Sequence, residues 1–111
     1  DELTQAKTRV ALEEENFTEN TLLILLDIDG FSDINELYGM EIGNQVLQEI
    51  SGKLRKYLDF PIFRVSADVF GIFIEDMKYL NMSVVERINY IKNLLEDDEF
   101  IIDDNIIDIN V

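Results

Sequence analysis

Apolar and polar positions along the first half of the chain predict one strand and three helices. A short helix is expected over residues 8–15. Thr21–Ile28 is a compact run of Leu and Ile with polar residues before it and Asp-Gly after it, which predicts a buried strand. Phe31–Tyr38 predicts a short helix that ends at Gly39. Glu41–Leu58 predicts an amphipathic helix because its apolar residues recur at helical spacing. These residues are Ile42, Val46, Leu47, Ile50, Leu54 and Leu58.

The second half of the chain predicts two hairpins separated by a further helix. Ile62–Val65 and Val69–Ile74 are expected to be strands, and the three residues between them favour an antiparallel hairpin. The helix is marked by apolar residues at helical spacing: Val84, Ile88, Ile91 and Leu95. The last hairpin consists of Phe100–Ile102, Asp103-Asp104-Asn105 and Ile106–Val111. This order predicts an α+β fold with an antiparallel-rich central sheet covered by helices.

The composition is that of one folded domain over residues 1–111, with 47% hydrophobic and 30% charged residues. A net charge of −15 argues against contact with nucleic acid or an anionic membrane, because both require clustered Lys and Arg. There is no Cys, no His and no apolar run long enough to span a bilayer, so we expect a cytoplasmic domain. The chain does not begin with Met, which suggests a piece of a longer protein.

The last part of the chain is strongly acidic. Glu96–Asp108 contains seven acids and no base, a pattern more typical of a solvated rim than of a cation or partner site. Three isoleucines near this end are expected to be exposed and to contact other parts of the parent protein. They are Ile106, Ile107 and Ile109.

Polar residues lie at the ends of the predicted elements. Asp27 and Asp29 fall on one face of the strand, where two carboxylates suit Mg²⁺, but acids also end strands simply because the chain leaves the core. Asp68 is an ordinary turn acid unless its strand neighbours that of Asp27, in which case the two would share an ion. Asn35 and Asn44 suit recognition of a nucleobase, although exposed or capping helix residues are the simpler explanation.

Together these segments resemble the GGDEF domain family of diguanylate cyclases over essentially the whole chain. Asp1-Glu2-Leu3-Thr4 is similar to the family's D-x-L-T motif. Leu26–Gly43 is similar to its D-x-D-x-F-K-x-[IV]-N-[DE]-x-[YF]-G-H-x-x-G-D segment, and Arg64–Phe70 falls where R-[IVY]-G-G-[DE]-E-F belongs. The resemblance implies a ferredoxin-like fold of the nucleotidyl-cyclase palm type. The family continues past the position of Val111, so the C-terminal part of that fold is expected to be missing.

The family makes cyclic di-GMP from two GTP molecules held on two facing domains. By resemblance, Asp27, the carbonyl of Ile28 and Asp68 would hold Mg²⁺, in a weakened form of the family's site. By the same resemblance, a second set of residues would contact the nucleotide, and the side-chain amides of Asn35 and Asn44 would hydrogen-bond to guanine. This set is Phe31, Ser32, Asn35, Asn44 and Ala67.

Six positions depart from the family's motifs. They are Ser32, Met40, Asn44, Ser66, Ala67 and Val69. Val69 replaces a metal-binding Glu, while Ser66 and Ala67 replace two glycines that let the nucleotide approach. Asn44 replaces an Asp that accepts hydrogen bonds from guanine, and losing one such charged bond costs about 1.5–3 kcal/mol. We therefore predict an inactive domain, with residual cyclase activity as the alternative.

The resemblance also bears on ligands and partners. The family's product-inhibition motif, R-x-x-D, is not present in register, because the nearest match, Lys56–Asp59, has Lys for Arg and is displaced by one residue. We therefore predict no cyclic di-GMP receptor there. The implied role is regulatory, dimerising or docking, beside an EAL phosphodiesterase or a sensor domain, with weak binding of GTP or none.

Overall fold

The computed structural model describes residues 1–97, 100–102 and 105–111. The strands of this part are β1 (Lys7–Thr8), β2 (Leu22–Asp27), β3 (Ile62–Ser66), β4 (Val69–Ile74), β5 (Phe100–Ile102) and β6 (Asn105–Ile107). The helices are α1 (Arg9–Glu13), α2 (Phe31–Tyr38), α3 (Met40–Tyr57) and α4 (Val84–Glu96), with a 3-10 turn, η1, at Met77–Tyr79. The predicted α+β class is confirmed.

The central sheet has the strand order β1-β3-β4-β2. Strands β2 and β4 pair antiparallel from Leu22 opposite Ile74 to Asp27 opposite Val69. The predicted β3–β4 hairpin is confirmed, with an irregularity in the pairing between Arg64 and Ser66. The short strand β1 pairs parallel with β3, which makes the sheet mixed.

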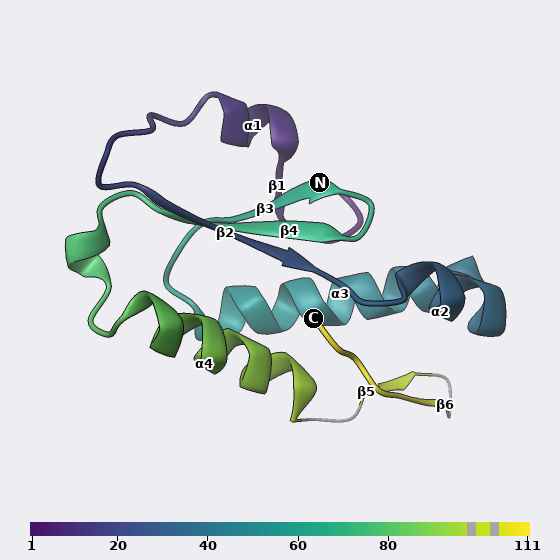
Figure 1. Ribbon diagram of the computed structural model, residues 1–111. Coiled ribbons are helices and arrows are strands. Elements are labelled where there is room, and N and C mark those ends of the chain that lie inside the picture. Colours follow the sequence, from purple (N-terminus) through teal and green to yellow (C-terminus); the bar gives the residue numbers. More distant parts are fainter. Residues whose placement is uncertain (98–99, 103–104) are drawn as a thin grey trace.

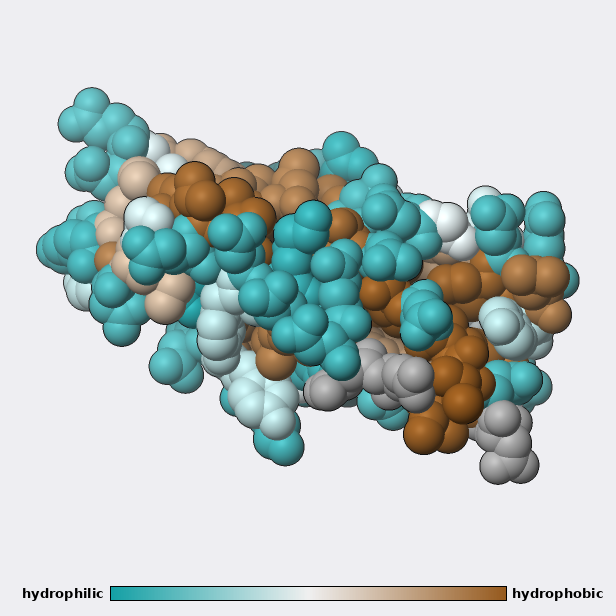
Figure 2. Space-filling view, turned by 60° about the horizontal axis from the view of Figure 1, so that its bottom comes forward, coloured by the Kyte–Doolittle hydropathy of each residue, from teal (hydrophilic) through white to brown (hydrophobic). Residues whose placement is uncertain are grey.

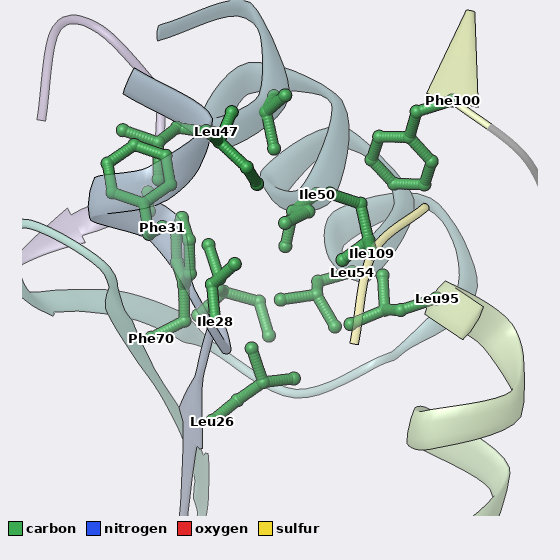
Figure 3. Packing of buried hydrophobic residues seen from close by; sticks show 14 of the residues in the cluster. Leu26, Ile28, Phe31, Leu47, Ile50, Leu54, Phe70, Leu95, Phe100 and Ile109 are labelled. Carbon is green, nitrogen blue, oxygen red and sulfur yellow. The ribbon is translucent and has the colours of Figure 1, made fainter. Parts of the chain in front are cut away.

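Helices α3 and α4 lie on one face of the sheet, and α1 lies on the other (Figure 1). The main core forms between the sheet and the apolar stripe of α3, where Val46, Ile50 and Leu54 are fully buried. Figure 3 shows these layers meeting, with side chains of the sheet, α3 and α4 directed toward one another. A second, smaller cluster of Leu12, Phe63 and Phe73 fills the α1 side.

The C-terminal segment corrects one expectation from the sequence. Only Ile106 of the three isoleucines is exposed, whereas Ile107 and Ile109 are each 3% exposed. Ile109 points into the core beside Leu54 and Leu95 (Figure 3). The segment after β6 runs back toward α3 (Figure 1), and the carbonyl of Asn110 accepts a hydrogen bond from the backbone N–H of Asp29 at 2.9 Å. The second strand of the hairpin is therefore Asn105–Ile107 and does not extend to residue 111.

The surface around the hairpin combines apolar and acidic residues. Ile101 and Ile106 lie opposite one another on β5 and β6 and are 70% and 60% exposed. Figure 2 shows hydrophobic side chains at the end of the molecule where the β5–β6 hairpin lies, with hydrophilic side chains around them. Asp97 and Asp108 are exposed as expected for a solvated rim, while Glu96 accepts a hydrogen bond from the backbone N–H of Val111 at 2.9 Å. Residues 98, 99, 103 and 104 of the acidic stretch lie outside the described residues.

Candidate functional site

The end of β2 and the β3–β4 turn meet at one end of the sheet. The backbone N–H of Ile28 donates to the carbonyl of Asp68 at 3.1 Å, and Asp27 lies in register with Val69. Strand β2, which carries Asp27, and strand β4, which follows the turn of Asp68, are thus neighbours, and this is the condition under which the two residues were expected to share an ion. Asp29 follows the end of β2 and is exposed like Asp27, with buried Ile28 between them.

The two aspartates have no partner within the described part of the chain. Neither carboxylate takes part in a hydrogen bond or ion pair with another described residue. Asp27 is exposed and Asp68 is half-buried. Because the side chain of Ile28 is in the core, this residue can bind a cation only through its backbone carbonyl. Two carboxylates and a carbonyl suit a Mg²⁺ ion that keeps several waters and shares phosphate oxygens with a nucleotide.

A full protein cage for a metal is not formed by the residues described. Among residues 1–97, 100–102 and 105–111, no group of three or more Asp, Glu, His or Cys side chains is placed to hold a metal ion. The position opposite Asp27 in the β-ladder is occupied by Val69, whose side chain is aliphatic and half-buried. The oxygen donors at this end of the sheet therefore suit weak, ligand-assisted binding.

The backbone of the β3–β4 turn is held by Arg64. Its guanidinium donates to the carbonyl of Ala67 at 2.9 Å and to the carboxylate of Asp1 at 3.0 Å. Asp1 also accepts a hydrogen bond from the hydroxyl of Thr4 at 2.7 Å. The buried hydroxyl of Ser51 on α3 donates to the carbonyl of Thr4 at 2.7 Å. The N-terminal turn, the β3–β4 turn and α3 are thereby joined in one polar network, although the side chain of Ala67 is exposed.

Helix α2 places Phe31 and Ser32 beside the end of β2. Gly30 has a φ of 65°, a left-handed conformation that favours glycine, and it turns the chain from the strand into the helix. The side chain of Phe31 is 8% exposed and belongs to the core, so it can contact a ligand only through its backbone. Ser32 is exposed and brings no positive charge to this position.

Asn35 and Asn44 lie on the adjacent helices α2 and α3. A Cβ atom at Gly43 would stand 1.8 Å from Oδ1 of Asn35, so the absence of a side chain at Gly43 makes room for the amide. Asn35 is half-buried and Asn44, next to Gly43 in the chain, is exposed. Neither side chain hydrogen-bonds to another described residue. The structure thus places two unpaired amides near the point where α2 and α3 pack together.

The other end of the sheet has a groove of about 480 Å³ that includes Tyr57 and Asp59 of the Lys56–Asp59 segment. Arg87 of α4 also lines this groove, with its guanidinium 5.6 Å from the ring centre of Phe60 and 5.5 Å from that of Tyr90. Its Nε atom is buried and has no hydrogen-bond partner among the described residues. Sequence reasoning missed Arg87 because no local motif links it to a segment about thirty residues earlier.

Comparison with known proteins decides the family. The model of the family described as "Diguanylate cyclase, GGDEF domain" matches residues 1–107. The chain belongs to the GGDEF domain family. Its members bind GTP and cyclic di-GMP, typically use Mg²⁺, and act in cyclic di-GMP signalling.

Solved structures show the same fold for this GGDEF domain. A diguanylate cyclase/phosphodiesterase from Caldicellulosiruptor saccharolyticus superposes with a TM-score of 0.80 at 19% identity, covering 98% of this chain and 69% of that one. The GGDEF domain of DgcB from Caulobacter crescentus, solved with c-di-GMP, gives 0.79 at 17% identity, covering 99% of this chain and 71% of that one. At these identities the likeness concerns the fold alone.

Sequence relatives of the GGDEF domain are larger proteins. An uncharacterized membrane protein of Staphylococcus epidermidis is 36% identical over 69 residues, which are 60% of this chain and 19% of that protein. One from Staphylococcus haemolyticus is 38% identical over 64 residues, which are 56% of this chain and 18% of that protein. The chain thus matches about a fifth of the length of these relatives. Within the described residues, no helix is long and apolar enough to cross a bilayer.

Proposed function

We propose that this GGDEF domain is catalytically silent and works as a regulatory, dimerisation or docking module in cyclic di-GMP signalling. The observation that carries the proposal is the pairing of Asp27 with Val69, which sets an aliphatic side chain where the family motif has a metal-binding Glu. Cyclic di-GMP synthesis needs metal ions to polarise the α-phosphate and activate the attacking 3′-hydroxyl. A site with one carboxylate fewer holds such ions less well.

Other side chains at the site add to this defect. Ser66 and Ala67 put exposed side chains in the turn where the motif has two glycines, which reduces the room for a nucleotide. Ser32 is neutral where the motif has Lys, which removes one attraction for phosphate. Because synthesis requires two complete half-sites at once, the separate losses multiply.

The remaining groups support weak binding of GTP without turnover. Asp27, the carbonyl of Ile28 and Asp68 would hold Mg²⁺ together with the phosphates, where the ion would neutralise their charge. Asn35 and Asn44 would meet the base through their unpaired amides. Without a bound cation, the acidic surroundings oppose an anionic ligand, so we expect binding to depend strongly on Mg²⁺.

The proposed setting is the cytoplasmic side of a larger protein. The sequence relatives are membrane proteins of which the matched segment is about a fifth, which supports attachment to further domains. An adjacent EAL phosphodiesterase or sensor domain is the partner that the family resemblance favours, with homodimerisation as a further mode. The net charge of −15 disfavours direct contact of this domain with nucleic acid or anionic lipid.

Residual cyclase activity is the second candidate, and the proximity of Asp27 and Asp68 favours it. Both carboxylates are unpaired and adjoin the same turn. The double substitution Ala67→Gly with Val69→Glu separates the candidates. If these two positions alone prevent catalysis, the double variant should form cyclic di-GMP. If the site also lacks other groups that catalysis needs, the double variant should form none.

Calorimetric titration of GTP with Mg²⁺ into the full-length protein, alongside a cyclic di-GMP assay, tests the proposal. We expect weak binding without product, and loss of the binding signal in Asp27→Ala. Asp33→Ala is the matched control, because Asp33 is an exposed acid on α2 outside the proposed metal ligands. The absence of binding would limit the role to docking or dimerisation, and product formation by the wild type would contradict the proposal.

A further inference from the structure

The groove at the end of the sheet opposite the candidate metal ligands has no part in the proposed nucleotide chemistry. It forms where α3 ends, β3 begins and β4 ends, and its volume of about 480 Å³ is typical of a ligand cleft. Backbone hydrogen bonds hold its walls. The N–H of Phe73 donates to the carbonyl of Pro61 at 3.1 Å, and the N–H of Met77 donates to the carbonyl of Asn20 at 2.8 Å. The groove is therefore a fixed feature of the fold.

Aromatic side chains line much of this groove. Phe73 is buried and Phe60 is half-buried, whereas Tyr57 and Tyr79 are 49% and 63% exposed. Exposed tyrosines are frequent contact residues in protein interfaces, because each offers a large ring together with a hydroxyl that can hydrogen-bond. The faces of such rings also attract cations.

Three carboxylates from separate segments also line the groove. Glu15 follows α1, Asp59 follows α3 and Glu75 follows β4, and none of them forms a hydrogen bond or ion pair through its side chain with another described residue. Arg87 is the single base among the described lining residues, and its guanidinium donates to Oδ1 of Asn81 at 3.3 Å. The carboxylates therefore outnumber the one cation, and the groove attracts positive charge.

The spacing of these carboxylates favours an extended ligand over a single metal ion. Among residues 1–97, 100–102 and 105–111, no three acids are placed to hold one ion. A peptide with several basic side chains can meet separate carboxylates and aromatic rings at once. Arginine suits this lining best, because its flat guanidinium stacks on an aromatic ring and donates two hydrogen bonds to one carboxylate.

We propose that this groove docks a basic, arginine-containing segment of a protein partner. The charge of the domain is complementary to such a segment, since the chain has 24 acids and only 9 bases. The inference gives the docking role of the proposed function a surface and rests on that role. It does not depend on nucleotide binding or on catalytic silence, because the groove lies at the other end of the sheet.

The test is binding of capped pentapeptides to the full-length protein at physiological ionic strength, measured by calorimetry. The probes are Gly-Arg-Gly-Arg-Gly and the same peptide with lysine or glutamate in place of arginine. We expect the arginine peptide to bind most tightly and the glutamate peptide not to bind. Asp59→Asn with Glu75→Gln should weaken binding of the arginine peptide by about tenfold, the effect of two partly exposed ion pairs.

Glu36→Gln with Glu41→Gln is the matched control. It removes the same charge from exposed positions of α2 and α3, and Glu41 lies about 24 Å along α3 from Tyr57. It should change the affinity by less than about twofold, because salt screens charges at this distance. Equal weakening by the two double substitutions would show attraction to net charge alone and would overturn the inference.

The aromatic part of the groove is tested by Tyr79→Ala. It should lower the affinity for the arginine peptide by about threefold, the value of one cation–π contact at an exposed ring. Tyr38→Ala, at an exposed tyrosine on α2, should leave this affinity unchanged.

Three further outcomes would overturn the inference. Equal affinities for the arginine and lysine peptides would contradict the choice of arginine. Preference for the glutamate peptide would show that Arg87 is the binding group. No binding of the arginine peptide would exclude this docking surface, while catalytic silence would still be decided separately by the cyclic di-GMP assay.

Discussion

Two sets of polar side chains in this GGDEF domain differ in how completely the fold pairs them. The first set joins the N-terminal turn to the β3–β4 turn and α3, and every member is hydrogen-bonded; it comprises Asp1, Thr4, Ser51 and Arg64. The second set has no side-chain partner among the described residues; it comprises Asp27, Asp68, Asn35 and Asn44.

The difference separates the residues that hold the turn from those that face a ligand. Thr4 and Ser51 are buried, so an unpaired polar group there would be costly. Asp27 and Asn44 are exposed and water satisfies them, so the fold does not depend on their hydrogen bonds. The backbone of the nucleotide site can therefore persist while the chemistry of its side chains changes.

Arg64→Ala should have the largest effect on stability. It removes the cation that bridges Asp1 and the carbonyl of Ala67, and both side chains of the ion pair are less than one quarter exposed. We expect a loss of about 2 kcal/mol in the free energy of unfolding, measured with urea. Arg64→Lys should recover only part of it, because an ammonium cannot reproduce the forked geometry. A loss below about 0.5 kcal/mol would show that the network does not hold the turn.

Ser51→Ala should cost less, about 1 kcal/mol, because it leaves the carbonyl of Thr4 without its neutral donor and otherwise removes only a long, 3.3 Å hydrogen bond from the exposed Arg55. Thermal or urea unfolding measures the change. Ser32→Ala is the control, since Ser32 is an exposed helical serine and its loss should leave stability nearly unchanged. Equal effects of the two substitutions would show that the hydrogen bond of Ser51 does not help to hold the turn.

Gly43→Ala should separate binding from stability. The new Cβ would displace the amide of Asn35, which can swing aside, so we expect stability to change by less than about 1 kcal/mol. Nucleotide affinity should fall by about tenfold, the value of one lost hydrogen bond pair. Gly52→Ala is the control on the same helix, because nothing lies within 4 Å of its Cβ. It should leave affinity unchanged; a similar fall there would trace the effect to α3 as a whole.

Asp68→Asn should have the smallest effect on folding. Its carboxylate has no described partner, so the free energy of unfolding should change by less than about 0.5 kcal/mol. Binding of Mg²⁺ with nucleotide should nevertheless weaken, because one of two carboxylates is lost. Titration of Mg²⁺ at fixed nucleotide measures this change. A marked loss of stability would instead place Asp68 among the structural residues.

The sequence predicted the elements that carry a strong local pattern. Glu41–Leu58 repeats apolar residues over five turns, and α3 follows that prediction to within one residue at each end. Strand β1 was missed because two residues are too few to show a period. Ile107 and Ile109 were expected to be exposed but are buried. A run of apolar residues does not indicate whether other elements of the fold cover it.

The site was only partly predictable for the same reason. From the sequence, Asp27 and Asp68 could share an ion only if their strands were neighbours, and the pairing of β2 with β4 meets that condition. The contact between Arg64 and Asp1 joins residues 63 positions apart, and no local pattern indicates it. Arg87 reaches its groove from α4 only through the tertiary packing of that helix.

The most direct test of the account is the amount of cyclic di-GMP that the wild-type full-length protein, at high concentration, forms from GTP and Mg²⁺. Asp27→Ala is the control that distinguishes synthesis at this site from a contaminating activity. The account predicts no product from either protein above the level without enzyme. Product from the wild type that disappears in Asp27→Ala would contradict it, and would show that the domain is an enzyme despite Val69.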